Sequence, residues 1–294
     1  MIYPTGAQRH LLDDGRWHFQ YGPIDLIIDT TGNAVACGRA IERAWLRFAE
    51  ILPELVSELA LLRRPVRGAN PLRGSVARRM YEACWPYREP FITPMAAVAG
   101  SVADELIGFF RNEAGVDRAY INNGGDIALH LNTGQSYHVG LYSDLARFDG
   151  SPVSLDGDFV IDARLPVRGV ATSGWRGRSF SLGIADSVTV LAADAAAADA
   201  AATIIANAVA SNHPAVRRAP ASSLKDDSDL GDLPVTVDVG ELPRDEVSAA
   251  LNKGAAKAAT VLQRGLIHGA VLVLRGQMEV VGLEALSGRF LRGT

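Results

Sequence analysis

The segment Ala193–Ala210 combines small apolar residues with a few oxygen-bearing side chains at helical spacing. Asp199, Thr203 and Asn207 stand four residues apart, so on a helix they share one face. A carboxylate among alanines is unusual, because buried carboxylates are normally paired or bind cations. Carboxylate and hydroxyl oxygens at this spacing suit Mg²⁺, which takes few protein ligands and leaves room for phosphate oxygens. Asp199 and Thr203 are therefore candidate metal ligands.

A capped core helix is the alternative interpretation of this segment. Asp194 is a plausible N-cap, and alanines allow close packing on a sheet. This interpretation accounts for Asp194 and the alanines but not for Asp199. Asn207 is expected to be a structural hydrogen-bonding residue.

The second polar segment is "INNGGDIAL", which lies between two expected strands. A hairpin turn explains its paired glycines. The functional alternative is that Gly124 and Gly125 let backbone N–H groups approach a phosphate or a ring, with Asn123 and Asp126 beside them.

The third polar segment is "GVATSGWRGRSF". Thr172, Ser173 and Gly174 form either a simple turn or a small loop around a ligand. Arg176 and Arg178 add positive charge nearby.

An arginine-rich stretch follows the first long helical pattern. It is either a solvated basic surface or a clamp for phosphate or carboxylate groups. Its arginines are Arg63, Arg64, Arg67, Arg73, Arg78, Arg79 and Arg88. Neither a Walker loop nor a Rossmann fingerprint occurs, and the histidines fall in no metal-ligand spacing.

The composition is that of a globular protein with 48% hydrophobic and 21% charged residues, and its net charge is −4. Negative charge argues against nucleic-acid binding. Cys37 and Cys84 are expected to be buried free thiols. The N-terminus has no apolar signal region and no window resembles a membrane span, so we expect a cytoplasmic location.

Helices and short strands are expected to alternate irregularly along the chain. Helical patterns cover 34–62, interrupted at Pro53, then 76–84, 94–115, 193–210 and 244–265. Asn33 is the expected N-cap of the first of them. Strands are expected at 119–122, 126–131, 136–142, 152–155, 158–162, 167–173, 180–184 and 187–192. Further strands are expected at 24–28 and 234–239 and in a closing hairpin that turns near Arg275. The pattern favours an α+β fold with a mostly antiparallel sheet.

Taken in order, the three polar segments resemble the ApbE family of flavin transferases. That family carries an Asn-x-Gly-Gly-[Asp/Glu] turn, an Ala-Thr-Ser-Gly loop, and Ser-Val-Thr-Val before a helix with Ala-Asp-Ala-x-Ala-Thr. The matching residues are Asn122 to Asp126, Ala171 to Gly174, Ser187 to Val190 and Ala198 to Thr203. Met95 to Leu106 is similar to the family's preceding helix, so the resemblance covers about residues 90–210.

The resemblance implies an ApbE-like, T-fold-like architecture and Mg²⁺-dependent transfer of FMN from FAD to a protein threonine. It implies metal ligation by Asp199 and Thr203, with a backbone carbonyl from Ala96–Ala99 as a third ligand. Flavin-nucleotide contacts are implied for the glycine turn, Asn123 to Asp126, and for the loop residues Thr172, Ser173 and Gly174.

Two features depart from the family pattern. A family segment with a catalytic histidine is replaced by "WRGRSFSLGIAD", and Ala99-Gly100-Ser101 stands where the family has Ala-Lys-Gly. No catalytic residue is therefore assigned, although His18, Asp25 and Asp186 are possible replacements for the base.

We expect one ApbE-like domain over residues 1–294. Its parts are strands, helices and the arginine stretch (1–90), the motif-bearing core (90–210), a flexible polar loop (217–233) and a C-terminal strand, helix and hairpin (234–294). The expected ligands are FAD and Mg²⁺, with FMN transfer or pyrophosphate cleavage as the reaction. The alternatives are action on another anionic cofactor or heterocycle, and flavin binding without catalysis. A homodimer is slightly favoured over a monomer.

Overall fold

The computed structural model describes residues 6–141, 157–283 and 288–290 of the 294-residue chain. The described residues fall into two compact units. Unit 1 draws on Met1–Ser136, Asp162–Ala171 and Ala192–Ala200, and unit 2 on Tyr137–Ile161, Thr172–Leu191 and Ala201–Thr294. The sequence expectation of a single domain stays a prediction.

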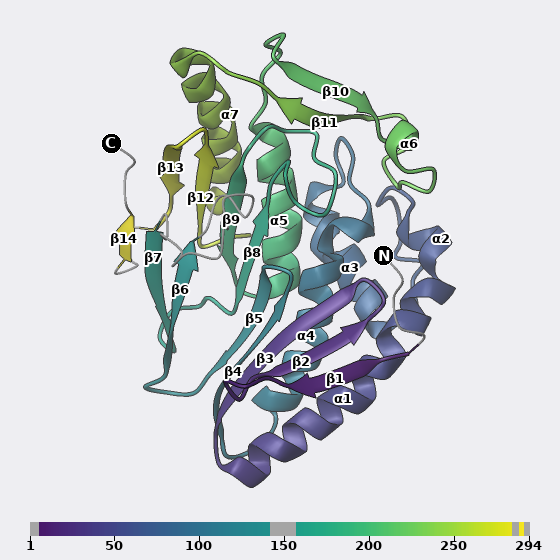
Figure 1. Ribbon diagram of the computed structural model, residues 1–294, viewed down its shortest axis with the longest axis vertical. Helices are drawn as coiled ribbons and strands as arrows, with labels where there is room; N and C mark the ends of the chain where they lie inside the picture. The colour runs from purple at the N-terminus through teal and green to yellow at the C-terminus, as the bar shows by residue number, and fades with distance from the viewer. Residues whose placement is uncertain (1–5, 142–156, 284–287, 291–294) are drawn as a thin grey trace. The chain divides into compact units, whose positions relative to one another are not determined.

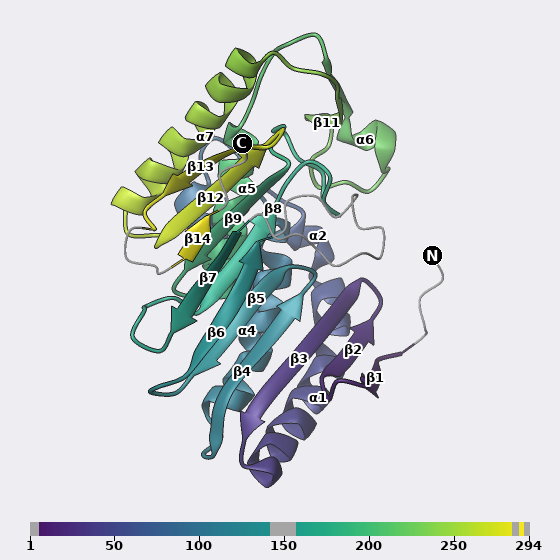
Figure 2. The same cartoon turned by 60° about the vertical axis from the view of Figure 1, so that its left-hand side comes forward.

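Unit 1 is built on an antiparallel sheet (Figure 1 and Figure 2). Its strands pair in the order β1, β2, β3, β4, β5 and β8, with Ile127 of β5 opposite Val170 of β8. Their bounds are β1 Gln8–Leu11, β2 Trp17–Tyr21, β3 Ile24–Gly32, β4 Val116–Asn123, β5 Asp126–Leu131 and β8 Gly169–Ser173.

Helices pack on this sheet, α1 against β3 and α4 against β4 and β5. Their bounds are α1 Ala34–Ser57, α2 Leu59–Leu62, α3 Ser75–Cys84 and α4 Val98–Arg111, with 3₁₀ turns at Trp85–Tyr87 and Pro94–Ala97. The core between sheet and helix centres on Phe19. The centroid of its ring lies 5.1 Å from the ring centroid of Trp45 and 5.5 Å from that of Phe48. Asn33 caps α1 as expected, accepting hydrogen bonds from the N–H groups of Val35 and Ala36.

The predicted interruption at Pro53 is wrong, because α1 continues to Ser57. Proline removes one helical hydrogen bond. Pro53 itself is exposed, whereas Ile51 and Leu55 on either side of it are buried in the core. Burial of Ile51 and Leu55 therefore stabilises the helical backbone on both sides of Pro53.

Unit 2 contains three groups of strands. β9 (Ser187–Ala192), β12 (Gly269–Leu274) and β13 (Gln277–Val281) form an antiparallel group, with α7 (Arg244–Gln263) packed against β12 and β13. β10 (Val216–Pro220) pairs with β11 (Pro234–Val239), and α6 (Ala221–Leu224) follows β10. The third group is β6 (Ser136–Leu141), β7 (Gly157–Asp162) and β14 (Gly288–Phe290). Helix α5 (Ala195–Ala208) begins in unit 1 and ends in unit 2.

The mixture of helices and antiparallel strands confirms the α+β prediction. The expected hairpin turn is also present, with Arg275 and Gly276 both at positive φ between β12 and β13. The strand expected at 152–155 lies outside the described residues. Residues 217–233, expected to be a loop, contain the end of β10 and all of α6, because pairing with β11 orders the start of this segment.

The strand predicted at 180–184 is wrong. This segment bonds to the end of α5 instead: the Leu182 N–H donates to Asn207 Oδ1, and the Ile184 N–H donates to the Val209 carbonyl. Gly183 allows the approach, because a Cβ there would lie 1.9 Å from the Ala206 carbonyl oxygen. Asn207 is thus the structural hydrogen-bonding residue expected.

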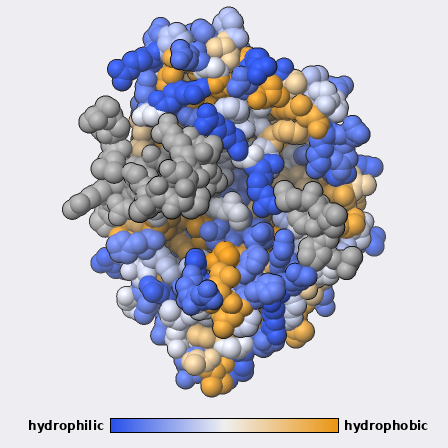
Figure 3. All heavy atoms as spheres, viewed as in Figure 1, coloured by the Kyte–Doolittle hydropathy of each residue, from blue (hydrophilic) through white to orange (hydrophobic). Residues whose placement is uncertain are grey.

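None of the described helices is long and apolar enough to cross a membrane. On the face in Figure 3, hydrophobic residues form separate groups between hydrophilic ones. Cys84 is buried as expected, but the expected burial of Cys37 is wrong: this residue is partly exposed, and its Sγ accepts a hydrogen bond from Thr30 Oγ1.

Candidate functional site

The glycine turn is a two-residue hairpin between β4 and β5. Asn123 pairs with Asp126, and Gly124 and Gly125 have φ values of 65° and 111°. These positive values fit a turn that excludes most other residues. The Gly125 N–H donates to Asn122 Oδ1 at 2.8 Å. The turn interpretation is therefore confirmed, and Asp126 next to the turn is buried.

Asn123 connects this hairpin to the start of α4. Its Nδ2 donates to the Ala99 carbonyl at 3.1 Å, and only 7% of the residue is exposed. The hairpin is therefore hydrogen-bonded to Ala96–Ala99, the segment whose backbone carbonyl was expected to be a metal ligand.

Asp199 reaches the same turn of α4 from α5. Its Oδ2 accepts a hydrogen bond from the Gly100 N–H at 3.0 Å. Ala99 and Gly100 are consecutive, so the glycine turn, the α4 start and the Asp199 helix meet at one peptide group of unit 1. We call the four residues Ala99, Gly100, Asn123 and Asp199 the Asp199 corner.

The electrostatics of the corner disfavour a negative charge on Asp199. Burial raises the pKa of Asp199 to about 7, the N–H groups of Gly100 and Ala99 oppose the rise, and the Asp104 charge adds to it. Among the described residues, Asp199 forms no ion pair with a lysine, arginine or histidine. A bound cation would supply that missing charge.

Two glycines allow the backbones to meet at this corner. A Cβ on Gly100 would lie 2.2 Å from the Ala195 carbonyl oxygen, and a Cβ on Gly169 would lie 2.0 Å from the Asp194 carbonyl oxygen. Both distances are far below any real Cβ contact, so α4 and β8 pack directly on the start of α5. Asp194 caps α5 as expected, since its Oδ1 accepts from the Ala197 N–H at 2.8 Å.

The remaining predicted site residues belong to unit 2. Thr172 shares a 2.9 Å hydrogen bond with Thr189 of β9. Gly174 has no room for a side chain, because a Cβ would lie 2.3 Å from the Asp186 carbonyl oxygen. Ser173 and Thr203 are partly exposed, and Thr203 lies one turn beyond Asp199 in α5. Their ligand roles stay predictions.

The three residues named as possible bases already have partners. His18 Nε2 and Asp25 Oδ1 are 2.9 Å apart, on neighbouring strands β2 and β3 of unit 1. In unit 2, Asp186 accepts hydrogen bonds from the Arg275 N–H and from Trp175 Nε1. None of the three contacts the Asp199 corner through a described hydrogen bond.

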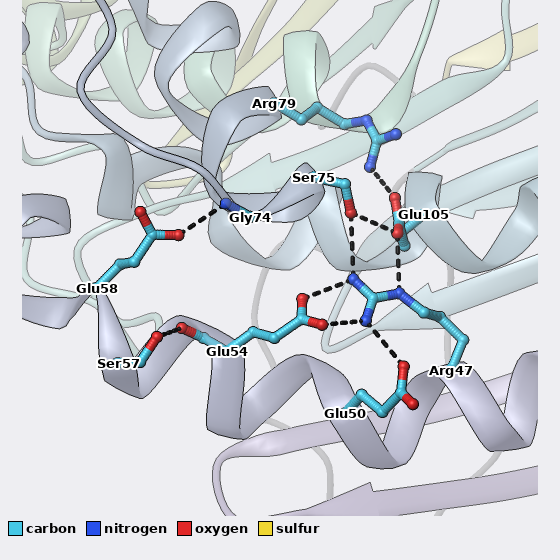
Figure 4. A network of polar contacts seen from close by, with 9 residues as sticks. All are labelled: Arg47, Glu50, Glu54, Ser57, Glu58, Gly74, Ser75, Arg79 and Glu105. Carbon is cyan, nitrogen blue, oxygen red and sulfur yellow. Dashed lines mark hydrogen bonds and ion pairs between the residues drawn. The ribbon is translucent and has the colours of Figure 1, made fainter.

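A second polar cluster in unit 1 was not foreseen from the sequence (Figure 4). Arg47 of α1 donates to Glu54 at 2.6 Å and, through Nε, to Glu105 of α4 at 3.0 Å. Ser75 and Arg79 of α3 also donate to Glu105. We call these five residues the Arg47 network. The seven-residue spacing of Arg47 and Glu54 on one helix was its only local signal.

The arginine-rich stretch divides between these contacts and the surface. Arg79 joins the Arg47 network, and Arg88 lies over the Trp85 ring at 4.2 Å. Arg78 is exposed, 3.9 Å from Glu82. No group of three acidic, histidine or cysteine side chains arranged for a metal occurs among the described residues.

The chain is similar to proteins of one family over most of its length. A family model described as AbpE bacteria matches residues 9–280. The UPF0280 protein of Methanosphaerula palustris is 42% identical over 119 residues, which cover 40% of this chain and 47% of that relative. The UPF0280 protein of Methanospirillum hungatei is 37% identical over 133 residues, covering 45% and 50%. The chain spans about half the length of these curated relatives.

Two solved structures are also similar. The ApbE protein of Thermotoga maritima has 13% sequence identity and a TM-score of 0.41, covering 93% of this chain and 96% of that chain. The apo form of the flavinyl transferase ApbE from Pseudomonas stutzeri has 12% identity and a TM-score of 0.41, covering 94% of each chain.

Proposed function

The chain belongs to the ApbE-like family whose model is described as AbpE bacteria, and on that premise we propose that it binds a flavin nucleotide with Mg²⁺ and cleaves or transfers part of it. One observation carries the proposal: the Asp199 corner joins three segments that are distant in sequence. Asp199 bonds to Gly100, and Asn123 bonds to Ala99. These are three of the segments that resemble the ApbE pattern.

The donor set of the corner suits Mg²⁺. This ion is commonly held by one or two carboxylates together with substrate phosphates, so a single protein carboxylate is enough. Asp199 has that carboxylate and lacks a cationic partner among the described side chains. Thr203, four residues further along α5, and the Ala99 carbonyl are the other proposed oxygen ligands. Bound there, Mg²⁺ would neutralise charge on the pyrophosphate as its bridge breaks.

The chain's own residues would bind and orient the nucleotide. The open backbone at Gly124 and Gly125 can approach a phosphate or ring closely. Asp126, Thr172, Ser173 and Gly174 are the other proposed contacts. Cleavage of the FAD pyrophosphate would release AMP and leave FMN on the oxygen of water or of an acceptor hydroxyl.

Flavin binding without transfer is the second candidate. It is favoured by residues 175–186, which contain no histidine to act as the base. Asp186 in that stretch is engaged by Arg275 and Trp175. An enzyme of this scaffold that acts on another anionic cofactor or heterocycle is the remaining alternative.

Mass spectrometry distinguishes these functions. The purified chain is incubated with FAD and Mg²⁺, with and without a threonine-containing acceptor peptide, and AMP and FMN are quantified against an EDTA control. We expect Mg²⁺-dependent release of AMP. Flavin binding without AMP release supports the second candidate, and a different co-purified anion supports an enzyme that acts on another cofactor. A folded chain that neither binds nor consumes FAD contradicts the flavin proposal.

A further inference from the structure

We propose that Asp104 is a positioning residue for the Asp199 carboxylate, an inference that rests on the function proposed for the Asp199 corner. Asp104 lies in α4 and its carboxylate crosses to α5. Its Oδ1 accepts from the Ala195 N–H at 3.1 Å, and its Oδ2 accepts from the Ala196 N–H at 2.8 Å. These are the first two residues of α5.

The opposite contact closes a ring between the two helices. Asp199 of α5 accepts from Gly100, in the first turn of α4. Gly100 and Asp104 are one turn apart in α4, and Ala195 and Asp199 are one turn apart in α5. Each helix therefore supplies a carboxylate to unpaired N–H groups at the start of the other.

The contact leaves little freedom for the start of α5. Gly100 is packed so closely on Ala195 that a Cβ would approach its carbonyl oxygen to 2.2 Å. An aspartate side chain is short, so the position of the Asp199 carboxylate follows the backbone of α5. A shift of about 1 Å in a bound geometry can cost about a hundredfold in rate. The Asp104 bonds fix the backbone from which Asp199 projects.

Helix α5 already has a local cap in Asp194, so capping alone does not explain the role of Asp104. Asp194 accepts from the Ala197 N–H at 2.8 Å without leaving its own chain segment. Burial of Asp104 has an electrostatic cost, since it raises the pKa of that carboxyl to about 6, with a further contribution from the Asp194 charge. What Asp104 adds to the existing cap is the connection to α4.

The variants Asp104→Ala and Asp194→Ala test the proposal as a matched pair. Each removes one capping carboxylate from α5, but only the first removes the connection to α4. Hydrogen exchange is followed at the Gly100 amide, which bonds to Asp199, and is scaled to the Leu106 amide of the same helix. We expect Asp104→Ala to speed scaled exchange at Gly100 by about tenfold or more, and Asp194→Ala by less than about threefold.

A second readout measures the affinity of each variant for FAD with Mg²⁺. Calorimetry with FAD and Mg²⁺ should give affinity about tenfold weaker for Asp104→Ala and nearly unchanged for Asp194→Ala. Asp104→Asn keeps one acceptor oxygen, so it should fall between the wild type and Asp104→Ala. It also replaces Asp104→Ala if that variant does not fold.

The outcomes separate this inference from the proposed function. If the wild type binds no FAD with Mg²⁺, the proposed function fails, and the exchange at Gly100 alone decides whether Asp104 positions Asp199. Equal changes in the two alanine variants, in exchange or in affinity, would overturn the positioning role.

Discussion

Asp104 and Glu105 are consecutive in α4, yet their environments shift their acidities in opposite directions. Burial raises the pKa of Asp104 to about 6, against two backbone N–H groups and the charge of Arg79. Burial also acts on Glu105, but hydrogen bonds from Ser75, Arg79 and Arg47 outweigh it and hold the pKa of Glu105 below its usual value. The opposite pKa shifts follow from the hydrogen-bond partners. Glu105 accepts from guanidinium groups, whereas Asp104 accepts from backbone N–H groups.

This contrast separates a structural cluster from a site that can accept a ligand. In the Arg47 network, Glu54 pairs with Arg47, and Glu105 pairs with both Arg47 and Arg79, so each carboxylate has a guanidinium partner. At the Asp199 corner, Asp199 forms no ion pair with a lysine, arginine or histidine among the described residues, and Arg79 is the cationic side chain whose charge acts on the nearby Asp104. A carboxylate that already has a guanidinium partner needs no external cation, whereas at the Asp199 corner we propose that Mg²⁺ supplies the positive charge.

Removing Arg47 should have the largest effect on stability. Arg47→Met removes the ion-pair partner of Glu54 and one of the three side-chain donors to Glu105, and breaking a buried ion pair in this way costs about 3–5 kcal/mol. The side chains of Arg47 and Glu105 are each 15% exposed and that of Glu54 is 42% exposed, so solvent offsets the loss at Glu54 more than at Glu105. Urea unfolding measures the change.

Arg78→Met is the control for the Arg47 prediction. Arg78 is 59% exposed and 3.9 Å from Glu82, so its removal should change stability by less than about 1 kcal/mol. Equal losses in the two variants would contradict the view that the network is a buried structural cluster.

The two carboxylates of α4 should give opposite pH dependences. With a pKa raised from 3.8 to about 6, Asp104 holds its proton longer in the folded chain than in the unfolded chain. Its contribution to stability is therefore present at low pH and declines as pH rises from about 4 to about 6, by about 3 kcal/mol at most. Asp104→Asn should flatten the stability curve in that window.

Glu105→Gln is the matched variant for the pH series. A lowered pKa stabilises the folded chain above the unfolded pKa, and the contribution is lost as pH falls below it. Glu105→Gln should therefore lose stability near neutral pH and little at acid pH. The urea unfolding midpoint of each variant is measured between about pH 3 and about pH 8, a range that spans the ordinary carboxyl pKa values near 4. These midpoints give the stability curves of both variants. Parallel curves for the two variants would contradict the comparison.

Gly100→Ala should have a smaller effect that isolates the packing of the corner. Its Cβ would collide with the Ala195 backbone, and forcing extra atoms into a packed interior costs about 1–3 kcal/mol. Gly108→Ala is the control in the same helix, where no atom lies within 4 Å of a new Cβ. It should stabilise the chain by about 0.5–1 kcal/mol through helix propensity. Destabilisation by Gly108→Ala, or none by Gly100→Ala, contradicts the packing described.

The sequence predicted features whose causes are local. Asn33 and Asp194 are helix caps, and the Asn123 to Asp126 turn is a hairpin, because each depends on a few adjacent residues. Pro53 was misjudged because burial of neighbouring residues overrides the local effect of proline.

The contacts between helices could not be predicted in the same way. Nothing near Asp104 in the sequence indicates that it bonds to Ala195, about ninety residues away. The same holds for Arg47 and Glu105 across the Arg47 network. Asp199 was identified from its odd surroundings and from an ordered resemblance, but its bond to Gly100 required the fold.

Asp199 is proposed to support Mg²⁺-dependent binding of a flavin nucleotide, and calorimetry measures this dependence. FAD is titrated into the wild type, Asp199→Asn and Asp194→Asn, each with Mg²⁺ and with EDTA. We predict that Mg²⁺ strengthens FAD binding to the wild type and to Asp194→Asn, and that Asp199→Asn weakens the Mg²⁺-dependent affinity by about tenfold or more. An Asp199→Asn variant that binds FAD with Mg²⁺ as tightly as the wild type would contradict the claim.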